Sequence, residues 1–277
     1  MLEIILFAVG LVGFGLAGYY DLRYTEFHDI LPYSLIVIVL LIRGVFAFLS
    51  SDFSILINSA ITGLLFLGLG FILYLTKQWG DGDAWLLGCF GFLFSDPQSM
   101  LFLNGFNSLV PFQLAALFNF FIISVVYIIL YSFVIGLRTP GIYKDFTSAM
   151  NSNKKKLYGS LSLPILVLAA AFYFFLTAFY QYSFIFSLLT LLLVCLVFFG
   201  YYTKSLEKLA FRKKISTKNL KEGDVLIGNR WRSLTKKEVA KLKRTKKYVQ
   251  IKEGVRFAPV FIITLLITVL FGGLLFL

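Results

Sequence analysis

The sequence predicts an all-α polytopic membrane protein of about eight transmembrane helices, with a small cytoplasmic α+β domain inserted before the last helix. Of its 277 residues, 59% are apolar and 14% are charged, whereas soluble domains have about 25% charged residues. Apolar stretches of about 20 residues, the length that crosses a bilayer as a helix, recur along the chain. The excess positive charge, in contrast, is confined to one segment near the end.

The apolar stretches predict eight spans. They cover 2–20, 30–49, 55–76, 84–103, 110–137, 161–180, 182–202 and 258–277. The fourth is the weakest, because a Ser-Asp-Pro sequence at 95–97 interrupts its apolar residues.

The basic residues predict how these spans are oriented. If all eight cross, then Arg23, Lys77, the 138–160 loop and the 203–256 segment share one side, and the loops on the other side contain no Lys or Arg. The positive-inside rule makes the basic side cytoplasmic, with the N- and C-termini both outside. Arg43, near an outer helix end, is the exception, and we expect its side chain to snorkel to the interface.

The expected domain organisation has three parts: a transmembrane helical domain at 1–202, a basic cytoplasmic domain at 203–256, and a final transmembrane helix at 257–277. The middle part has 18 basic and 5 acidic residues, a net charge of +13. This favours contact with anionic lipid headgroups over nucleic-acid binding. The loop 139–160 is predicted to be a flexible connector.

Local signals in the basic domain predict a small α+β unit. A strand is expected at 225–227 and another at 248–251, on either side of a helix. Thr235 and Glu238 form a capping box that begins this helix, which we expect to run to about Arg244.

The residue inventory excludes several enzyme classes. His28 is the only histidine, and the two cysteines, Cys89 and Cys195, lie in different apolar segments. A zinc protease needs several ligands at set spacing, and we expect no metal site. A histidine-dependent serine or cysteine hydrolase would rely entirely on His28.

The acidic residues near the membrane point to a different chemistry. Asp21 ends the first predicted span and Asp83 begins the fourth, so the predicted topology brings both to the cytoplasmic face. Two nearby carboxyl groups resist ionising together, so that one keeps its proton while the other activates water. This pairing predicts an aspartic dyad, and the sequence leaves open which residue is the acid and which is the base.

Four stretches carry a family resemblance. Residues 80–83, Gly-Asp-Gly-Asp, match the GxGD motif of membrane aspartic proteases. Residues 21–31 resemble the first-aspartate segment of type IV prepilin peptidases. Residues 83–87 and 253–261 are similar to the archaeal branch that processes preflagellins and other prepilin-like precursors.

The resemblance to this prepilin and preflagellin peptidase family implies that Asp21 and Asp83 are catalytic and that Gly80 and Gly82 support the motif. It also implies an endopeptidase of the cell membrane that removes short basic leaders at the cytoplasmic face, without metal or cofactor. The expected partners are type IV prepilin-like or archaellin precursors, together with membrane lipid.

Three acidic residues outside the dyad are candidates for binding the leader. Glu26, Asp29 and Asp81 would attract a short positively charged peptide, which the +13 domain cannot do. The alternative for each of them is an ordinary solvated loop acid.

Two other functions remain open at this stage. An intramembrane protease of the presenilin-like type also uses GxGD, although the Pro-Ala-Leu tripeptide of those enzymes does not occur here. A cation-coupled transporter with paired carboxylates would place them near the bilayer midplane. Asp21 and Asp83 also have a purely structural interpretation, as interfacial acids that cap helices.

Overall fold

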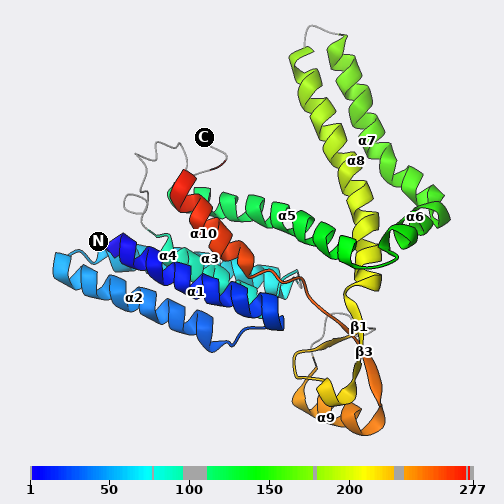
Figure 1. Ribbon diagram of the computed structural model, residues 1–277. Helices are drawn as coiled ribbons and strands as arrows, with labels where there is room; N and C mark the ends of the chain where they lie inside the picture. The colour runs from blue at the N-terminus through cyan, green and yellow to red at the C-terminus, as the bar shows by residue number, and fades with distance from the viewer. Residues whose placement is uncertain are drawn as a thin grey trace. The chain divides into compact units, whose positions relative to one another are not determined.

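The computed structural model (Figure 1) describes residues 2–76, 78–95, 111–176, 180–227, 234–272 and 274. The chain forms two compact units, which are described separately below. Unit 1 comprises Met1–Ile129 and Gly254–Leu277, and unit 2 comprises Leu130–Glu253.

In the described residues of unit 1, the only regular secondary structure is α-helix. The unit contains α1 (Leu2–Tyr24), α2 (Ile30–Ser50), α3 (Ser54–Leu75), α4 (Asp81–Leu93), the first part of α5 (Phe112–Arg138) and α10 (Pro259–Phe271). Unit 2 contains the end of α5, α6 (Ile142–Ser152), α7 (Lys154–Phe175), α8 (Tyr180–Leu209), β1 (Arg212–Ser216), η1 (Thr217–Asn219), β2 (Val225–Leu226), α9 (Lys236–Thr245) and β3 (Tyr248–Lys252).

This is a multi-pass helical membrane protein. Among the described residues, six helices are long and apolar enough to cross a bilayer, namely α1, α2, α3, α5, α7 and α8. Each of the other two expected spans coincides with a helix of only 13 residues, α4 or α10. Residues 96–103 of the expected fourth span lie outside the described residues, and a total of eight spans stays a prediction.

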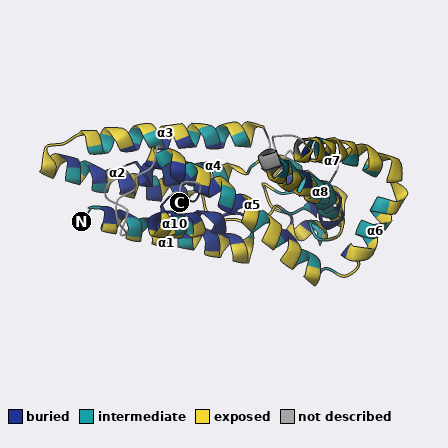
Figure 2. Cartoon of the chain, turned by 90° about the horizontal axis from the view of Figure 1, so that it is seen from above, coloured by how far each residue is buried: buried dark blue, intermediate teal, exposed yellow. Residues whose placement is uncertain are grey.

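Helix α4 forms the centre of unit 1: Ala84 and all residues from Leu86 to Leu93 are buried, and Figure 2 shows buried residues around it in dark blue. Glycines bring its backbone close to that of α3. A Cβ atom on Gly70 would lie 2.7 Å from the carbonyl oxygen of Ala84, and one on Gly91 would lie 2.8 Å from that of Thr62. Small residues permit such close helix packing within a membrane.

The expectation that Arg43 snorkels is wrong. Its side chain is 0% exposed, and Nη2 donates a hydrogen bond of 2.8 Å to the carbonyl oxygen of Leu93, the last residue of α4. Carbonyl groups at a helix end lack intrahelical partners and attract cations. The guanidinium therefore stabilises the end of α4 from inside the unit.

The expectation of a flexible connector at 139–160 is also wrong. Gly141, at a φ of 84°, leads into α6, and α7 follows almost at once. Ile142 is buried, and the Phe146 ring packs against Tyr202 of α8, with ring centroids 6.1 Å apart. This amphipathic packing stabilises a helix that its polar composition concealed.

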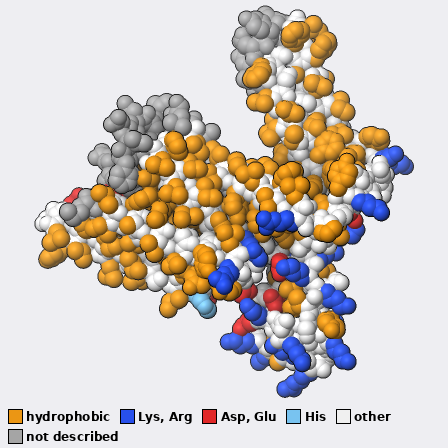
Figure 3. Space-filling model, viewed as in Figure 1, with side chains coloured by type: hydrophobic (Ala, Val, Ile, Leu, Met, Phe, Trp, Pro, Cys, Tyr) orange, Lys and Arg blue, Asp and Glu red, His pale blue; other side chains and the backbone are white. Residues whose placement is uncertain are grey.

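The small sheet of unit 2 is antiparallel, in the order β1-β3-β2. Strands at 225–226 and 248–252 confirm the two expected ones, and the Thr235–Glu238 capping box begins α9 as predicted. Strand β1 was not predicted, because Arg212, Lys213 and Lys214 show no alternation of apolar residues. Lys and Arg side chains gather over this domain in Figure 3, whereas apolar side chains cover unit 1.

Candidate active site

Asp21 lies in the last turns of α1 and is only 7% exposed. Its Oδ2 accepts a hydrogen bond of 2.9 Å from the backbone N–H of Ala258, and the N–H of Phe257 is a second donor. The positive charge of Arg256 also acts on this carboxylate. Residues more than 230 positions away thus provide its surroundings.

This contact makes Asp21 the cap of another helix. Ala258 is the N-cap residue of α10 and has no capping side chain of its own. The Asp21 carboxylate occupies that position from α1, close to the positive end of the α10 dipole. Gly18 permits the approach, because a Cβ atom there would lie 3.3 Å from Cα of Pro259.

Asp83 lies in the first turn of α4, three residues after its N-cap Gly80. Its carboxylate accepts a hydrogen bond from the Gly80 N–H, as the acidic residue of a capping box does. The side chain is half-buried. It lies close enough to Asp21 for the two charges to interact, and Asp81 adds a weaker repulsion.

Aromatic contacts hold the three segments of the site together. The Trp79 ring, just before Gly80, packs against Phe257 and Phe120, with centroids 5.4 and 5.6 Å apart. The α4 start and the segment before α10 are therefore fixed to each other. A Cβ atom on Gly82 would lie 2.7 Å from Cζ of Phe27. Glycine at this position therefore leaves room for the loop between α1 and α2 to pack against the start of α4.

That loop carries two of the expected leader contacts. Glu26 and Asp29 are exposed on either side of Phe27, and Asp81 is exposed in the adjacent first turn of α4. Phe27 thus brings the acidic loop next to the helix that carries Asp83. Gly80, an exposed N-cap residue, has the extended conformation that this position requires.

Sequence reasoning did not assign a role to Arg256, Phe257 or Ala258. The only available signal was that residues 253–261 resemble the prepilin peptidase family. The main-chain position of Arg256 is itself fixed, because Tyr127 Oη donates a hydrogen bond of 2.6 Å to its carbonyl oxygen. Its guanidinium donates to the carbonyl oxygen of Leu22, directly after Asp21.

The described residues contain no group of three or more His, Cys, Asp or Glu side chains that could hold a metal ion. Comparisons with protein families, with curated proteins and with solved structures found no match to this chain. The geometry of the site and the residues of its motif are therefore the basis for a functional proposal.

Proposed function

We propose that this protein is a membrane aspartic endopeptidase that removes the short basic leader from type IV prepilin-like or archaellin precursors at the cytoplasmic face. The observation that carries the proposal is the pairing of Asp21 and Asp83, whose charges interact although 61 positions separate them. A pair of carboxyl groups that share one proton is the chemical requirement of an aspartic protease.

The hydrogen bonds and nearby charges suggest which carboxyl group is the base and which is the acid. Asp21 accepts two backbone N–H groups and lies near a cation, whereas Asp83 accepts one N–H and faces two other acids. Donors and cations favour the charged form of a carboxyl group, and neighbouring acids disfavour it. Asp21 is therefore the charged base and Asp83 the protonated acid, although the proton belongs to the pair as a whole.

In the first step, the Asp21 carboxylate takes a proton from water while the water oxygen bonds to the peptide carbonyl carbon. Asp83 gives its proton to the carbonyl oxygen, which yields a neutral tetrahedral diol. In the second step, Asp21 gives its proton to the amide nitrogen and Asp83 takes one back from a hydroxyl group. The C–N bond breaks, and both carboxyl groups return to their starting forms.

The principal experiment tests the pair against its neighbour. Asp21→Asn and Asp83→Asn should each lower the cleavage rate of a prepilin-like precursor at least about 1,000-fold. The reason is that the loss of one residue of a catalytic unit costs about as much as the loss of the whole unit. Asp81→Asn, in the same helical turn as Asp83, is the matched control and should retain most of the activity. Activity that survives either of the first two changes would refute the proposal.

The role of Asp21 has its own test. Arg256→Gln should slow the cleavage step more than it weakens substrate binding, because the cation favours charge on the base. Arg256→Lys should recover part of the rate. Equal rates for the Gln and Lys variants would remove this assignment and leave the dyad itself untouched.

The substrate class is tested by charge reversal in the acidic loop. Glu26→Lys and Asp29→Lys should reduce cleavage of a lysine-rich leader more than cleavage of the same precursor with neutral leader residues. An equal reduction for both substrates would show that Glu26 and Asp29 do not recognise the positive charge of the leader.

A further inference from the structure

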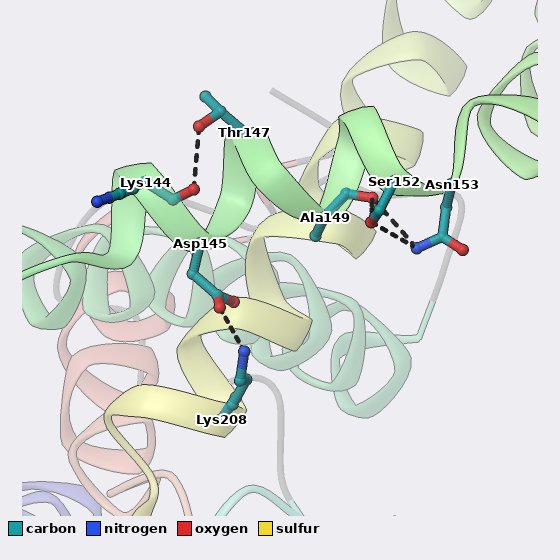
Figure 4. Close-up of polar contacts among 7 residues, drawn as sticks. All are labelled: Lys144, Asp145, Thr147, Ala149, Ser152, Asn153 and Lys208. Atoms are coloured by element: carbon teal, nitrogen blue, oxygen red, sulfur yellow. Dashed lines mark hydrogen bonds and ion pairs between the residues drawn. The ribbon is translucent and has the colours of Figure 1, made fainter.

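Unit 2 contains a cleft between α6 and α8, far in sequence from the aspartate pair. Its volume is about 360 Å³. Hydroxyl, amide and charged side chains line it, mainly those of Asp145, Ser148, Ser152, Asn153, Lys204 and Lys208. Figure 4 shows Asp145 of α6 pointing toward Lys208 of α8, with Ser152 and Asn153 near the end of α6.

One of the two lysines is already neutralised. The Lys208 Nζ donates to Asp145 Oδ1 in an ion pair. This hydrogen bond is the main cause that lowers the pKa of Asp145 below its ordinary value, so the carboxylate stays charged at neutral pH. Together, the two residues connect α6 to α8 and contribute no net charge to the cleft.

Lys204 supplies the remaining charge. Its Nζ lies 5.5 Å from the ring centroid of Tyr201, one helical turn earlier, and Tyr201 is itself buried. Within the described part of the chain, Lys204 forms no ion pair with an acidic side chain. The cleft thus combines the ammonium group of Lys204 with the hydroxyl group of Ser148.

This combination suits an anion with several oxygen atoms. Ser148 presents a hydroxyl group along one side of the cleft, where the Ser152 and Asn153 side chains are hydrogen-bonded within α6, and Lys204 presents an ammonium group on the other. A phosphate group accepts such hydrogen bonds on three or four oxygens at once, and the ammonium strengthens them.

The surroundings of the cleft indicate a lipid as the source of the phosphate. Lys204 lies near the end of the apolar stretch Phe186–Leu209, and α7 begins beside the cleft with three consecutive lysines, 154–156. Tyr143 on α6 is 78% exposed and Tyr158 on α7 is 66% exposed. Exposed tyrosines and lysines at the end of a span are typical of the headgroup region.

We propose that the α6–α8 cleft binds the phosphate of an anionic phospholipid headgroup, with Lys204 as its principal charged contact. This site is independent of the peptidase activity. A free phosphate ion has the same chemistry, so the experiment must separate the two sources.

The test uses the purified full-length protein in neutral detergent and counts bound lipid by native mass spectrometry. Phosphatidylglycerol should bind to the wild type, whereas phosphatidylcholine should bind much more weakly. Lys204→Gln should weaken phosphatidylglycerol binding by about five- to tenfold, as expected for one charge-assisted contact. Lys221→Gln, an exposed lysine of the small domain with the same change of charge, should leave binding unchanged.

Three outcomes would overturn the proposal. The first is equal binding of the two lipids, and the second is an equal loss in the Lys204 and Lys221 variants. The third is full displacement of the lipid by millimolar inorganic phosphate, which would make the cleft a site for the free ion. Circular dichroism of each variant verifies that it is folded, and Ser148→Ala provides a second, neutral change in the same cleft that should also weaken binding.

Discussion

The helices of unit 1 and the α7–α8 hairpin of unit 2 are similarly apolar but differ in how much of their surface the chain itself covers. In α1 and α2, 33% and 28% of the most apolar window is buried, whereas the value is 11% in both α7 and α8. The first group forms a core, and the second leaves most of its side chains to the surrounding medium. Apolar composition indicates a membrane location, but it does not tell which helices position a site.

Buried polar contacts also distinguish unit 1 from unit 2. In unit 1, Arg43, Ser59 and Asn119 are fully buried and hydrogen-bonded to main-chain atoms of α4 and of the residues after α10. Such contacts are costly to break, because a buried partner is left without a hydrogen bond. Substitutions in unit 1 should therefore have larger effects than comparable ones in unit 2.

The largest expected effect is at the α3–α4 contact. Gly70→Ala would bring a methyl group against the Ala84 carbonyl oxygen, a backbone atom that cannot move alone, and should destabilise unit 1 by about 1–3 kcal/mol. Gly68→Ala, on the same helix with no neighbour within 4 Å, is the matched control and should not lower stability. Thermal unfolding in detergent measures both variants. Equal melting temperatures would contradict the close contact.

The second-largest expected effect concerns the buried guanidinium of Arg43. Arg43→Met keeps the apolar stem of the side chain but leaves the Leu93 carbonyl oxygen without its donor, which should cost about 1–3 kcal/mol. Lys144→Met, an exposed position on α6, should change stability by less than about 0.5 kcal/mol. If the two substitutions had the same effect on thermal unfolding, the contrast between the units would fail.

A smaller effect is expected in the sheet domain. Thr235→Ala removes the N-cap of α9 and should cost about 1 kcal/mol. Hydrogen exchange should accelerate in the first turn of α9, with little change in the melting temperature of unit 1. Thr245→Ala, at the other end of the same helix, serves as the control and should leave that turn protected.

The smallest expected effect concerns the ion pair between Asp145 and Lys208, and it should appear only at low pH. Because Lys208 lowers the pKa of Asp145, their contribution to stability is complete above the carboxyl group's unfolded pKa, about 3.9, and is lost as the pH falls through the lower folded value. Exchange of the α6 amides, corrected for its intrinsic pH dependence, should rise below about pH 4. Asp145→Asn should abolish this dependence, and its persistence would assign it to another group.

Local patterns predicted much of the fold. Apolar stretches located the six long helices, and the Thr235–Glu238 spacing located the start of α9. Patterns could not show that Arg43 points inward, because a basic residue near a helix end has the same sequence signature whether it reaches the interface or caps a neighbouring helix. Strand β1 was missed for a related reason, since its pairing with β3 overrides the charge of Lys213 and Lys214.

The candidate site was predicted only in part. Motif and charge named Asp21 and Asp83, because each has a local signature at a helix end. The residues that hold Asp21 have no such signature, since a main-chain donor can belong to any amino acid. Ala258 contributes its N–H through its position in three dimensions, and that position depends on how α1 and α10 pack.

The capping of α10 by Asp21 also has a consequence for the biosynthesis of the protein. Asp21 leaves the ribosome more than 230 residues before Phe257 and Ala258, which donate hydrogen bonds to it. The surroundings of the carboxylate are therefore incomplete until these later residues have been translated and inserted. A nascent chain has both aspartates long before it has a finished site, so the proposed activity would begin only when residues 256–258 have reached their place.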